Sequence, residues 1–400
     1  MKLKEKFNYD HTLVACFVGY IVQAIVNNYL PLLFLTFQGT YGIPLSKITF
    51  LVTFNFGFQM VIDLVSPSFI DRIGYRASMI IAHACAAAGF LLLTILPELT
   101  PDPFIGIMIS VLVYAVGGGL LEVLVSPIVE ACPTDNKETA MSMLHSFYCW
   151  GHVGVVLLST LFFSAFGISQ WKVLARIWMI VPIANLVLFL LVPIRSLIAE
   201  DEKGLTMGQL CRSGLFWILM LMMLCAGASE QGVSQWASAF AESALGVSKS
   251  MGDLFGPMFF AVCMGSSRAI YGKFGEKIPL RKFMAASSVL CIFSYLLTSL
   301  SGSAVLGLLG CGICGFSVGI LWPGTFSLAS ASIKNGGTLM FALFALAGDV
   351  GCSSGPTFVG LVSSAAGDNL RTGILAGTIF PILMILSLFL LKRGREKAKV

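Results

Sequence analysis

Charged residues are scarce in this sequence: Asp, Glu, Lys and Arg make up only 11% of its 400 residues. Soluble globular proteins usually carry about 25%. Apolar residues make up 57%, and the mean hydropathy is +0.89. This composition excludes a soluble globular protein. We therefore expect a multi-pass membrane protein whose outer surface contacts the lipid bilayer.

The sequence also lacks features that several other functions need. It has no G-x-x-x-x-G-K-[ST] loop, which argues against an ATP-driven pump. No pairing of a nucleophile with a base stands out, so we expect neither an enzyme nor a resident cofactor. The eleven cysteines lie in apolar runs or near segments expected in the cytoplasm, a pattern that indicates no disulfide framework. Cys311 and Cys314 form a C-x-x-C without a second ligand pair, which favours packing over a metal site.

Long apolar runs predict twelve membrane-spanning helices, because one span needs roughly 20 apolar residues. The one long polar interruption, 195–213, divides them into six and six. We expect an all-α protein with an N-terminal bundle (1–194), a cytoplasmic linker (195–213) and a C-terminal bundle (214–400). The predicted spans are 11–37, 46–70, 76–97, 103–131, 138–166, 171–194, 212–243, 249–272, 280–301, 303–332, 336–366 and 369–391.

Basic residues indicate the orientation. With the N-terminus inside, 20 of the 25 Lys and Arg, Arg268 among them, fall on the inner side. Such an imbalance predicts that both termini are cytoplasmic, and we expect a monomer in the cell membrane. The same bias accounts for the formal charge of +5, so no nucleic-acid partner is expected.

The two halves of the sequence resemble each other. A shift of 202 residues lays Tyr41–Lys47 over Ser243–Lys249 and Asn28 over Glu230. This offset predicts two pseudo-symmetric six-helix bundles that arose by duplication. In transporters with parallel repeats of this kind, the solute site lies where the halves meet, near the bilayer midplane.

An acidic residue lies inside the predicted fourth span. Glu122 closes the run G-G-G-L-L-E, and an ionisable side chain at membrane depth is costly unless it faces a partner or a water-filled cavity. In the next span, His145, Tyr148 and His152 share one helical face at i, i+3 and i+7. Glu122 is therefore the first candidate for a functional site.

Amides and aromatic rings complete the predicted solute site. Amide and carboxylate groups beside aromatic faces suit a polyhydroxylated ring, since they bind hydroxyl groups while the aromatic face covers the ring. Hydrogen bonding between packed helices is the alternative interpretation. The candidate solute-binding residues are Gln23, Asn27, Asn28, Glu122, His145, Tyr148, Glu230, Gln231, Gln235, Trp236 and Trp322.

The loop after the second span carries a family motif. Asp71-Arg72-Ile73-Gly74-Tyr75-Arg76 resembles the D-R-x-G-R-R signature of the major facilitator superfamily. The resemblance implies the fold of that family and a role for Asp71, Arg72 and Arg76 in switching conformation, with Gly74 permitting a tight turn. Plain positive charge at the inner membrane face is the alternative interpretation.

Three further stretches resemble a narrower branch. Gly117–Glu122, Met141–Tyr148 and Gly319–Ala329 are similar to the fucose permease and sodium-dependent glucose transporter branch. This implies symport of a sugar-like solute with H⁺ or Na⁺. Glu122 is the expected coupling residue, joined by Asp63, whose place in the second span resembles the cation site of melibiose-type symporters. A structural role in helix capping or pairing is the alternative interpretation for Asp63. One departure is Pro31, where the branch carries an acid.

Two other functions stay open at this point. One is a proton-coupled exporter of drugs or metabolites, for which a larger and less polar cavity is expected. The other is a receptor with the transporter fold that binds a solute without net flux. The glycines of Gly351–Gly360 are expected to permit close packing and bending of their helix.

Overall fold

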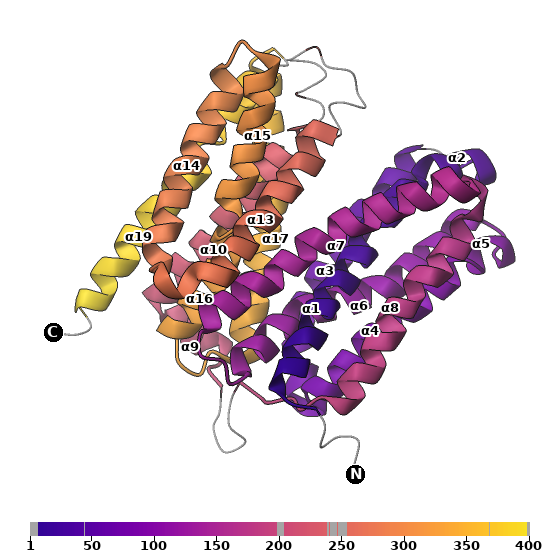
Figure 1. The fold of residues 1–400 in the computed structure, drawn as a ribbon, viewed down its shortest axis with the longest axis horizontal. Coiled ribbons are helices and arrows are strands. Elements are labelled where there is room, and N and C mark those ends of the chain that lie inside the picture. Colours follow the sequence, from indigo (N-terminus) through magenta and orange to yellow (C-terminus); the bar gives the residue numbers. More distant parts are fainter. Residues whose placement is uncertain are drawn as a thin grey trace. The chain divides into compact units, whose positions relative to one another are not determined.

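The computed structural model describes residues 7–43, 45–197, 204–237, 240, 246, 254–367 and 369–397. All secondary structure within these ranges is helical (Figure 1). The first half contains α1 (Tyr9–Asn28), η2 (Leu30–Leu33), α2 (Phe34–Tyr41), α3 (Leu45–Ile73), α4 (Tyr75–Leu93), α5 (Leu96–Leu99), α6 (Pro103–Ala131), α7 (Lys137–Phe166), η3 (Ile168–Gln170) and α8 (Trp171–Leu191). The second half contains α9 (Met207–Arg212), α10 (Gly214–Ser234), η4 (Leu254–Met258), α13 (Phe259–Phe274), η5 (Gly275–Lys277), α14 (Leu280–Leu300), α15 (Ala304–Val318), α16 (Leu321–Ser332), α17 (Gly337–Ala365), α18 (Leu370–Ala376) and α19 (Ile379–Lys397).

Ten helical stretches within these ranges are long and apolar enough to cross a membrane. They match ten of the twelve predicted spans. The predicted span 46–70 falls on α3, and 249–272 falls on η4 and α13 after a start that lies outside the described residues. The all-helical, multi-pass architecture is thereby confirmed.

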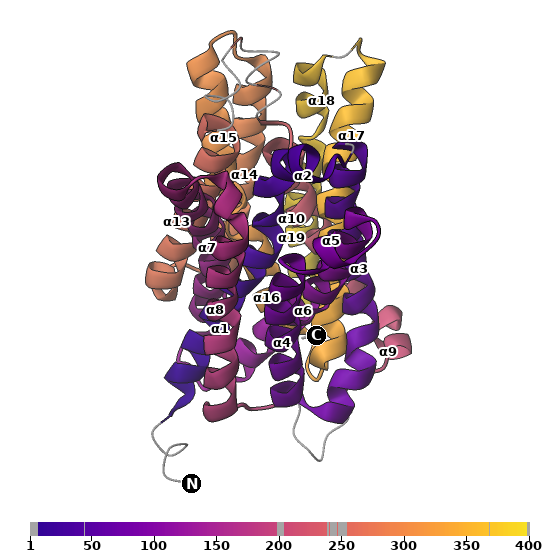
Figure 2. The same ribbon diagram turned by 90° about the vertical axis from the view of Figure 1, so that its right-hand side faces the viewer.

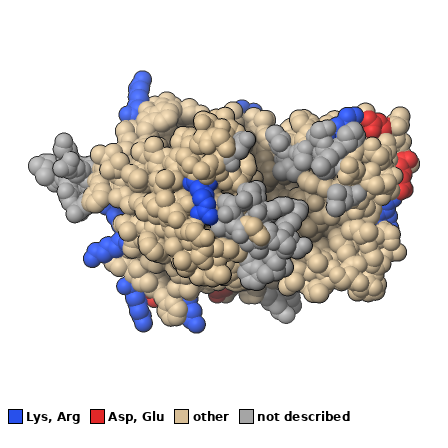
Figure 3. Space-filling view, turned by 90° about the horizontal axis from the view of Figure 1, so that it is seen from above, with Lys and Arg blue, Asp and Glu red and all other residues tan. Residues whose placement is uncertain are grey.

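Apolar side chains cover much of the surface. On α7, Leu157, Leu158 and Leu161 are all more than half exposed, and so are Leu386 and Phe389 on α19. On the face drawn in Figure 3, residues other than Lys, Arg, Asp and Glu make up most of the surface. A surface of this kind suits contact with lipid tails, where exposed apolar side chains carry no penalty.

The helix bounds of the two halves correspond at the predicted offset. Shifting α4 by 202 residues gives 277–295, against Leu280–Leu300 for α14. Shifting α6 gives 305–333, against Ala304–Ser332 for α15 and α16 together. The correspondence agrees with duplication, which stays a prediction because it compares positions along the chain and not superposed bundles.

The helices group into two compact units. The first combines Met1–Pro133 with Trp150–Glu202, and the second combines Thr134–Cys149 with Lys203–Val400. The beginning of α7 therefore groups with the second unit, whereas the sequence placed it in the 1–194 bundle. Its hydroxyl groups explain this: Ser142 Oγ and Ser146 Oγ donate hydrogen bonds to the backbone carbonyls of Arg268 (2.8 Å) and Gly265 (3.0 Å) on α13.

Three consecutive glycines let two helices approach α6 in the first unit. A Cβ added at Gly117 would lie 2.6 Å from the carbonyl oxygen of Ala82 on α4. A Cβ at Gly118 would lie 3.1 Å from the amide carbon of Gln59 on α3, and Gly119 also faces α3. The G-G-G run next to Glu122 thus brings α3 and α4 close to the helix that carries this acid.

Glycines also hold α10 against α17 in the second unit, as the sequence predicted for Gly351–Gly360. Side chains added at Gly227 or Gly351 would overlap the backbone of the facing helix, and a Cβ at Gly355 would lie 2.6 Å from the carbonyl oxygen of Ala228. Beyond these glycines, α18 folds back against α17 (Figure 2).

Replacing Gly355 by Ala is expected to destabilise the protein by about 1–3 kcal/mol, because the backbone of α10 must move to admit the methyl group. Thermal unfolding in detergent measures this. Gly154→Ala on α7 is the matched control, since no atom lies within 4 Å of its added Cβ. Unfolding of Gly355→Ala at the temperature of the Gly154→Ala control would contradict the packing.

Tight turns and breaks follow the sequence signals. Gly74, between α3 and α4, has a φ of +83°, a conformation that glycine adopts without strain. This confirms the turn predicted within the Asp71–Arg76 motif. Pro31 lies at the start of η2, where the helix of the first span is interrupted. The tenth predicted span is also broken, between Val318 and Leu321.

Candidate functional site

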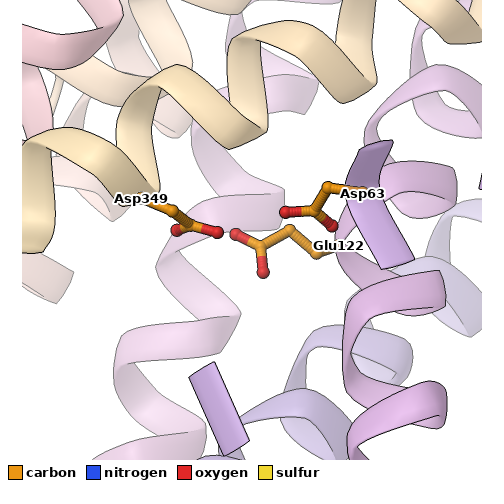
Figure 4. Close-up of side chains that lie close together, drawn as sticks. All are labelled: Asp63, Glu122 and Asp349. Carbon is orange, nitrogen blue, oxygen red and sulfur yellow. The ribbon is translucent and has the colours of Figure 1, made fainter. Parts of the chain in front are cut away.

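Two carboxylates meet in the first unit, one from α3 and one from α6. An oxygen of Asp63 and an oxygen of Glu122 lie within 4.8 Å of each other. Asp63 is fully buried, and Gln23 on α1 donates from Nε2 to Oε2 of Glu122 at 2.9 Å. Figure 4 shows the two carboxyl groups close together; Asp349, also labelled there, belongs to α17 of the second unit. We call Asp63 and Glu122 the carboxylate pair.

Residue spacing directs both acids to one helix interface. On α3, Asn55, Gln59 and Asp63 follow one another at intervals of four residues and so share a face. On α6, Glu122 lies one turn after Gly118, where the absence of a side chain leaves room for Gln59. The face of α3 with polar residues therefore packs on the face of α6 that carries Glu122.

Three amides form a second group beside the pair. Gln59 donates from Nε2 to Asn27 Oδ1 (2.8 Å) and to Asn55 Oδ1 (3.0 Å), and Asn55 donates from Nδ2 to Asn27 Oδ1 at 3.2 Å. We call these residues the amide cluster. The sequence predicted Asn27 but missed Asn55 and Gln59. Their four-residue spacing from Asp63, in a largely apolar part of α3, is the signal that identifies them.

The carboxylate pair has a definite chemical capacity. Two carboxylates this close repel each other strongly in a low-dielectric region unless a positive charge lies with them. A proton supplies that charge, and so does a hard cation such as Na⁺, which prefers oxygen ligands. The arrangement suits the ion-coupling role that the sequence predicts for Glu122 and Asp63, and that role stays a prediction.

The remaining predicted residue on α1 has a local role. Asn28 donates from Nδ2 to the carbonyl oxygen of Ala24 on the same helix at 2.8 Å. This bond turns the side chain back onto the backbone of its own helix, which agrees with the packing interpretation for this amide. Gln23 and Asn27 are thus the α1 residues that belong to the polar site.

The second unit contains a buried ion pair between α10 and α13. Arg268 and Glu230 approach to 3.1 Å, with 4% and 13% of their side chains exposed. Arg268 also donates from Nε to the carbonyl oxygen of Gly319 at 2.8 Å, and from Nη1 to the carbonyl oxygen of His145 at 3.2 Å and to Cys149 Sγ at 3.0 Å. One guanidinium therefore joins α7, α10, α13 and the break after α15.

Arg268 is a functional candidate that the sequence did not single out. It was counted among the basic residues of the inner membrane face, yet it is buried among helices. Counting basic residues along a sequence does not distinguish an arginine in a loop from a buried one. The acidic partner of Arg268, Glu230, is 38 residues away in the chain. Glu230, its partner, was predicted as a solute ligand and also accepts from Gln231 Nε2 at 3.3 Å.

Both predicted tryptophans contact neighbouring helices. Trp322 on α16 is buried, and its ring fills the space left by Gly348 on α17. Trp236 donates from Nε1 to the carbonyl oxygen of Pro356 at 2.9 Å, and Gln235 beside it is exposed. These contacts give both rings a packing role, and their predicted role in solute binding stays untested.

The histidine face of α7 is divided between the units. His145 is buried in the second unit, and its ring stacks on Phe326 with centroids 5.9 Å apart. Tyr148 is half-buried in the same unit, whereas His152 belongs to the first. The face predicted from the i, i+3, i+7 spacing exists, but its members are grouped with different parts of the chain.

The predicted switch residues have separate environments. Arg76 donates from Nη1 to the carbonyl oxygen of Phe189 (2.6 Å) and from Nη2 to that of Val192 (2.7 Å), at the C-terminal end of α8. A cation is favourable there because the last carbonyls of a helix lack partners. Arg72 is exposed, and the side chain of Asp71 lies outside the described residues. The switching role of all three stays a prediction.

The profile of the Major Facilitator Superfamily matches residues 12–356 of the sequence. The chain belongs to the Major Facilitator Superfamily. It is therefore a multi-pass membrane transporter and not an enzyme. No curated protein shows significant similarity to the sequence.

Solved structures of this superfamily share the fold. A single-residue variant of the Escherichia coli fucose:proton symporter FucP has a TM-score of 0.80 and 16% identity, covering 95% of this chain and 98% of its own. The human organic anion transporter MFSD10 (TETRAN) has a TM-score of 0.74 and 15% identity, and the match covers 95% of this chain and 99% of that one. The proton:xylose symporter XylE, bound to 6-bromo-6-deoxy-D-glucose, has a TM-score of 0.78 and 13% identity, and the match covers 96% of this chain and 95% of that one. At these identities the likeness shows the fold alone.

Proposed function

We propose that this transporter carries a sugar or sugar-like solute together with H⁺ or Na⁺ by alternating access. The observation that carries the proposal is the carboxylate pair, of which Asp63 is buried and Glu122 half-buried, with Gln23 bonded to Glu122. A coupling ion needs a charged group at membrane depth that binds and releases it during the cycle. Two structural neighbours, FucP and XylE, are described as symporters of a sugar with protons, which agrees with this assignment.

Each group of polar residues has a separate role in this proposal. The carboxylate pair binds the ion, and Gln23 orients Glu122 through its hydrogen bond. The amide cluster supplies neutral hydrogen-bonding groups, which suit solute hydroxyls without adding charge. In the second unit, Glu230 and Gln231 offer further polar groups, and Arg268 compensates the charge of Glu230. A neutral polyhydroxylated solute fits this inventory.

Transport by the purified protein in proteoliposomes tests the proposal. Counterflow of radiolabelled monosaccharides is expected without any gradient, and accumulation is expected only when a proton or sodium gradient is imposed. The gradient that drives accumulation identifies the coupling ion. Binding of a sugar without counterflow would indicate a receptor, and absence of any sugar exchange would refute sugar transport.

Export of drugs or metabolites is the second function that the sequence left open. The amide cluster and the carboxylate pair make the site of the first unit strongly polar, whereas an exporter of apolar drugs needs a less polar cavity. In the second unit, Arg268 is paired with Glu230, which leaves this arginine unsuited to an organic anion. The proteoliposome experiment separates the two functions by the direction in which the gradient drives the solute.

A further inference from the structure

The turn between α13 and α14 carries a group of basic residues. The stretch Lys273–Lys282 contains four of them and a single acid, Glu276. Three of the basic residues, Lys273, Lys277 and Lys282, are exposed and form no ion pair among the described residues. We call these three the lysine group. Its positive charges are open to an anion from outside the chain.

The motif of the first half does not explain the lysine group. At the 202-residue offset, Lys273 takes the place of Asp71, so the acid that begins the Asp71–Arg76 motif is not repeated. Without a carboxylate at this position, a switching role like the one implied for Asp71 does not carry over to the second half. The charges of this turn therefore need another explanation.

The outer face of α14 places one of the lysines next to lipid. Exposed residues recur along this helix at intervals of three or four, and they are Ala286, Val289, Phe293, Leu296 and Leu300. This spacing marks one face of a helix, and its apolar side chains suit lipid tails. Lys282 is exposed on the same face, one turn before Ala286. It therefore lies at the end of a lipid-facing stripe, where headgroups replace tails.

The end of α13 has the same character. Ile270 and Phe274, one helical turn apart, are 43% and 48% exposed. The Nζ of Lys273 lies 5.5 Å from the centroid of the Phe274 ring. An apolar ring beside an ammonium group suits the boundary of the bilayer, because a lysine there keeps its stem in the apolar layer and its charge in the polar one. Both helices thus bring lysines to the level of the headgroups.

The backbone under the lysine group is held in place. Tyr271 is fully buried, and its hydroxyl donates to the carbonyl oxygen of Ile278 and to Glu138 Oε2, each at 3.2 Å. The Tyr271 ring stacks on Phe283 of α14 with centroids 5.0 Å apart. The amide of Ile278 also donates to the carbonyl oxygen of Gly275 at 3.0 Å. A turn that is already ordered loses less entropy when it binds a ligand.

We propose that the lysine group binds the phosphate of an anionic phospholipid headgroup. The partner is a lipid and not a soluble anion because Lys282 and Lys273 end two lipid-facing helix surfaces. The sequence predicts that this turn lies on the cytoplasmic side, where the leaflet contains anionic lipids. Each lysine near such a surface strengthens binding about fivefold. This inference is independent of the proposed sugar transport.

Binding of defined lipids to the purified full-length protein in detergent tests the assignment. Native mass spectrometry measures the dissociation constant of the first bound phosphatidylglycerol, with phosphatidylcholine as the neutral reference. The wild type is expected to prefer phosphatidylglycerol. In Lys282→Gln its affinity should fall about fivefold, and replacing all three lysines by Gln should remove the preference. A preference that persists in the triple variant would overturn the inference.

Lys334 supplies the matched control. It is an exposed lysine between α16 and α17. Residues Leu321–Ala329 of α16 are all buried, so no lipid-facing stripe of that helix leads to this lysine. Lys334→Gln removes the same charge as Lys282→Gln and should leave the affinity for phosphatidylglycerol unchanged. An equal loss in both variants would show that net charge alone attracts the lipid, and the lysine group would not be a site.

Inorganic phosphate distinguishes a lipid from a soluble anion. It is not expected to displace phosphatidylglycerol at millimolar concentration, and full displacement would overturn the assignment to a lipid. Thermal unfolding in detergent shows whether each variant is folded. Should the triple variant fail to fold, Lys282→Gln is compared with Lys282→Arg, which keeps the charge and should keep the affinity. Equal affinities of these two variants would also overturn the inference.

Discussion

Replacing Glu122 by Gln is expected to abolish gradient-driven accumulation while solute exchange continues. Gln keeps the size of the side chain and can still bond to Gln23 but cannot bind and release a proton or supply a negative charge to Na⁺. Without an ion to carry, the transporter still equilibrates its solute. The accumulation ratio in proteoliposomes should therefore fall to about 1, whereas counterflow keeps a measurable rate.

A matched control separates this effect from loss of an acid in general. Glu98 on α5 is an exposed carboxylate that pairs with Lys172, so Glu98→Gln removes one exposed charge of the first unit and leaves the carboxylate pair intact. This control should accumulate solute like the wild type. Undiminished uphill uptake by Glu122→Gln would show that coupling resides in another group.

Breaking the buried ion pair of the second unit is expected to have the largest effect on stability. Arg268→Gln removes the charge that compensates Glu230. The side chain of Glu230 is only 13% exposed, so water compensates little of its charge. Removing one partner of a buried pair typically costs about 3–5 kcal/mol, because the remaining charge is left uncompensated. Thermal unfolding in detergent should show a large decrease in stability for Arg268→Gln and for Glu230→Gln.

The double variant distinguishes a charge effect from lost packing. Glu230→Gln with Arg268→Gln leaves two neutral groups that can bond to each other, so its loss should be smaller than the sum of the single losses by about 0.5–3 kcal/mol. Strict additivity would mean that Arg268 acts through its contacts other than Glu230, those to Gly319, His145 and Cys149 among them. Transport by the double variant then shows whether the charges themselves serve the cycle.

The helices and the first acid could be predicted because their causes are local. A membrane span is recognisable as an apolar run, because the bilayer thickness sets its length and the lack of water requires its backbone hydrogen bonds to be internal. Glu122 stands out because a charge inside such a run needs a reason. Gly74 and the Gly351–Gly360 glycines were also found from sequence, since a turn or a close helix contact requires the missing side chain.

The rest of the site depends on which helices pack against each other. Residue spacing within one helix does not specify the neighbouring helices. Asn55 and Gln59 gain their role only because α1 and α6 pack on their face of α3. Trp322 packs where Gly348 leaves space, a contact that depends on α17 lying beside α16. The ion pair of Arg268 with Glu230 likewise forms only because α13 packs near α10.

The division of α7 between the units has a consequence for biogenesis. Ser142 bonds to the backbone of Arg268, which is 126 residues later in the chain. At a translation rate of about 5–20 residues per second, that partner emerges roughly 6–25 s after Ser142. All parts of the first unit precede residue 203, so its helices can assemble while the ribosome is still extending the second. A fragment starting at residue 204 would lack part of the second unit's own core, whereas one starting at residue 134 would contain it.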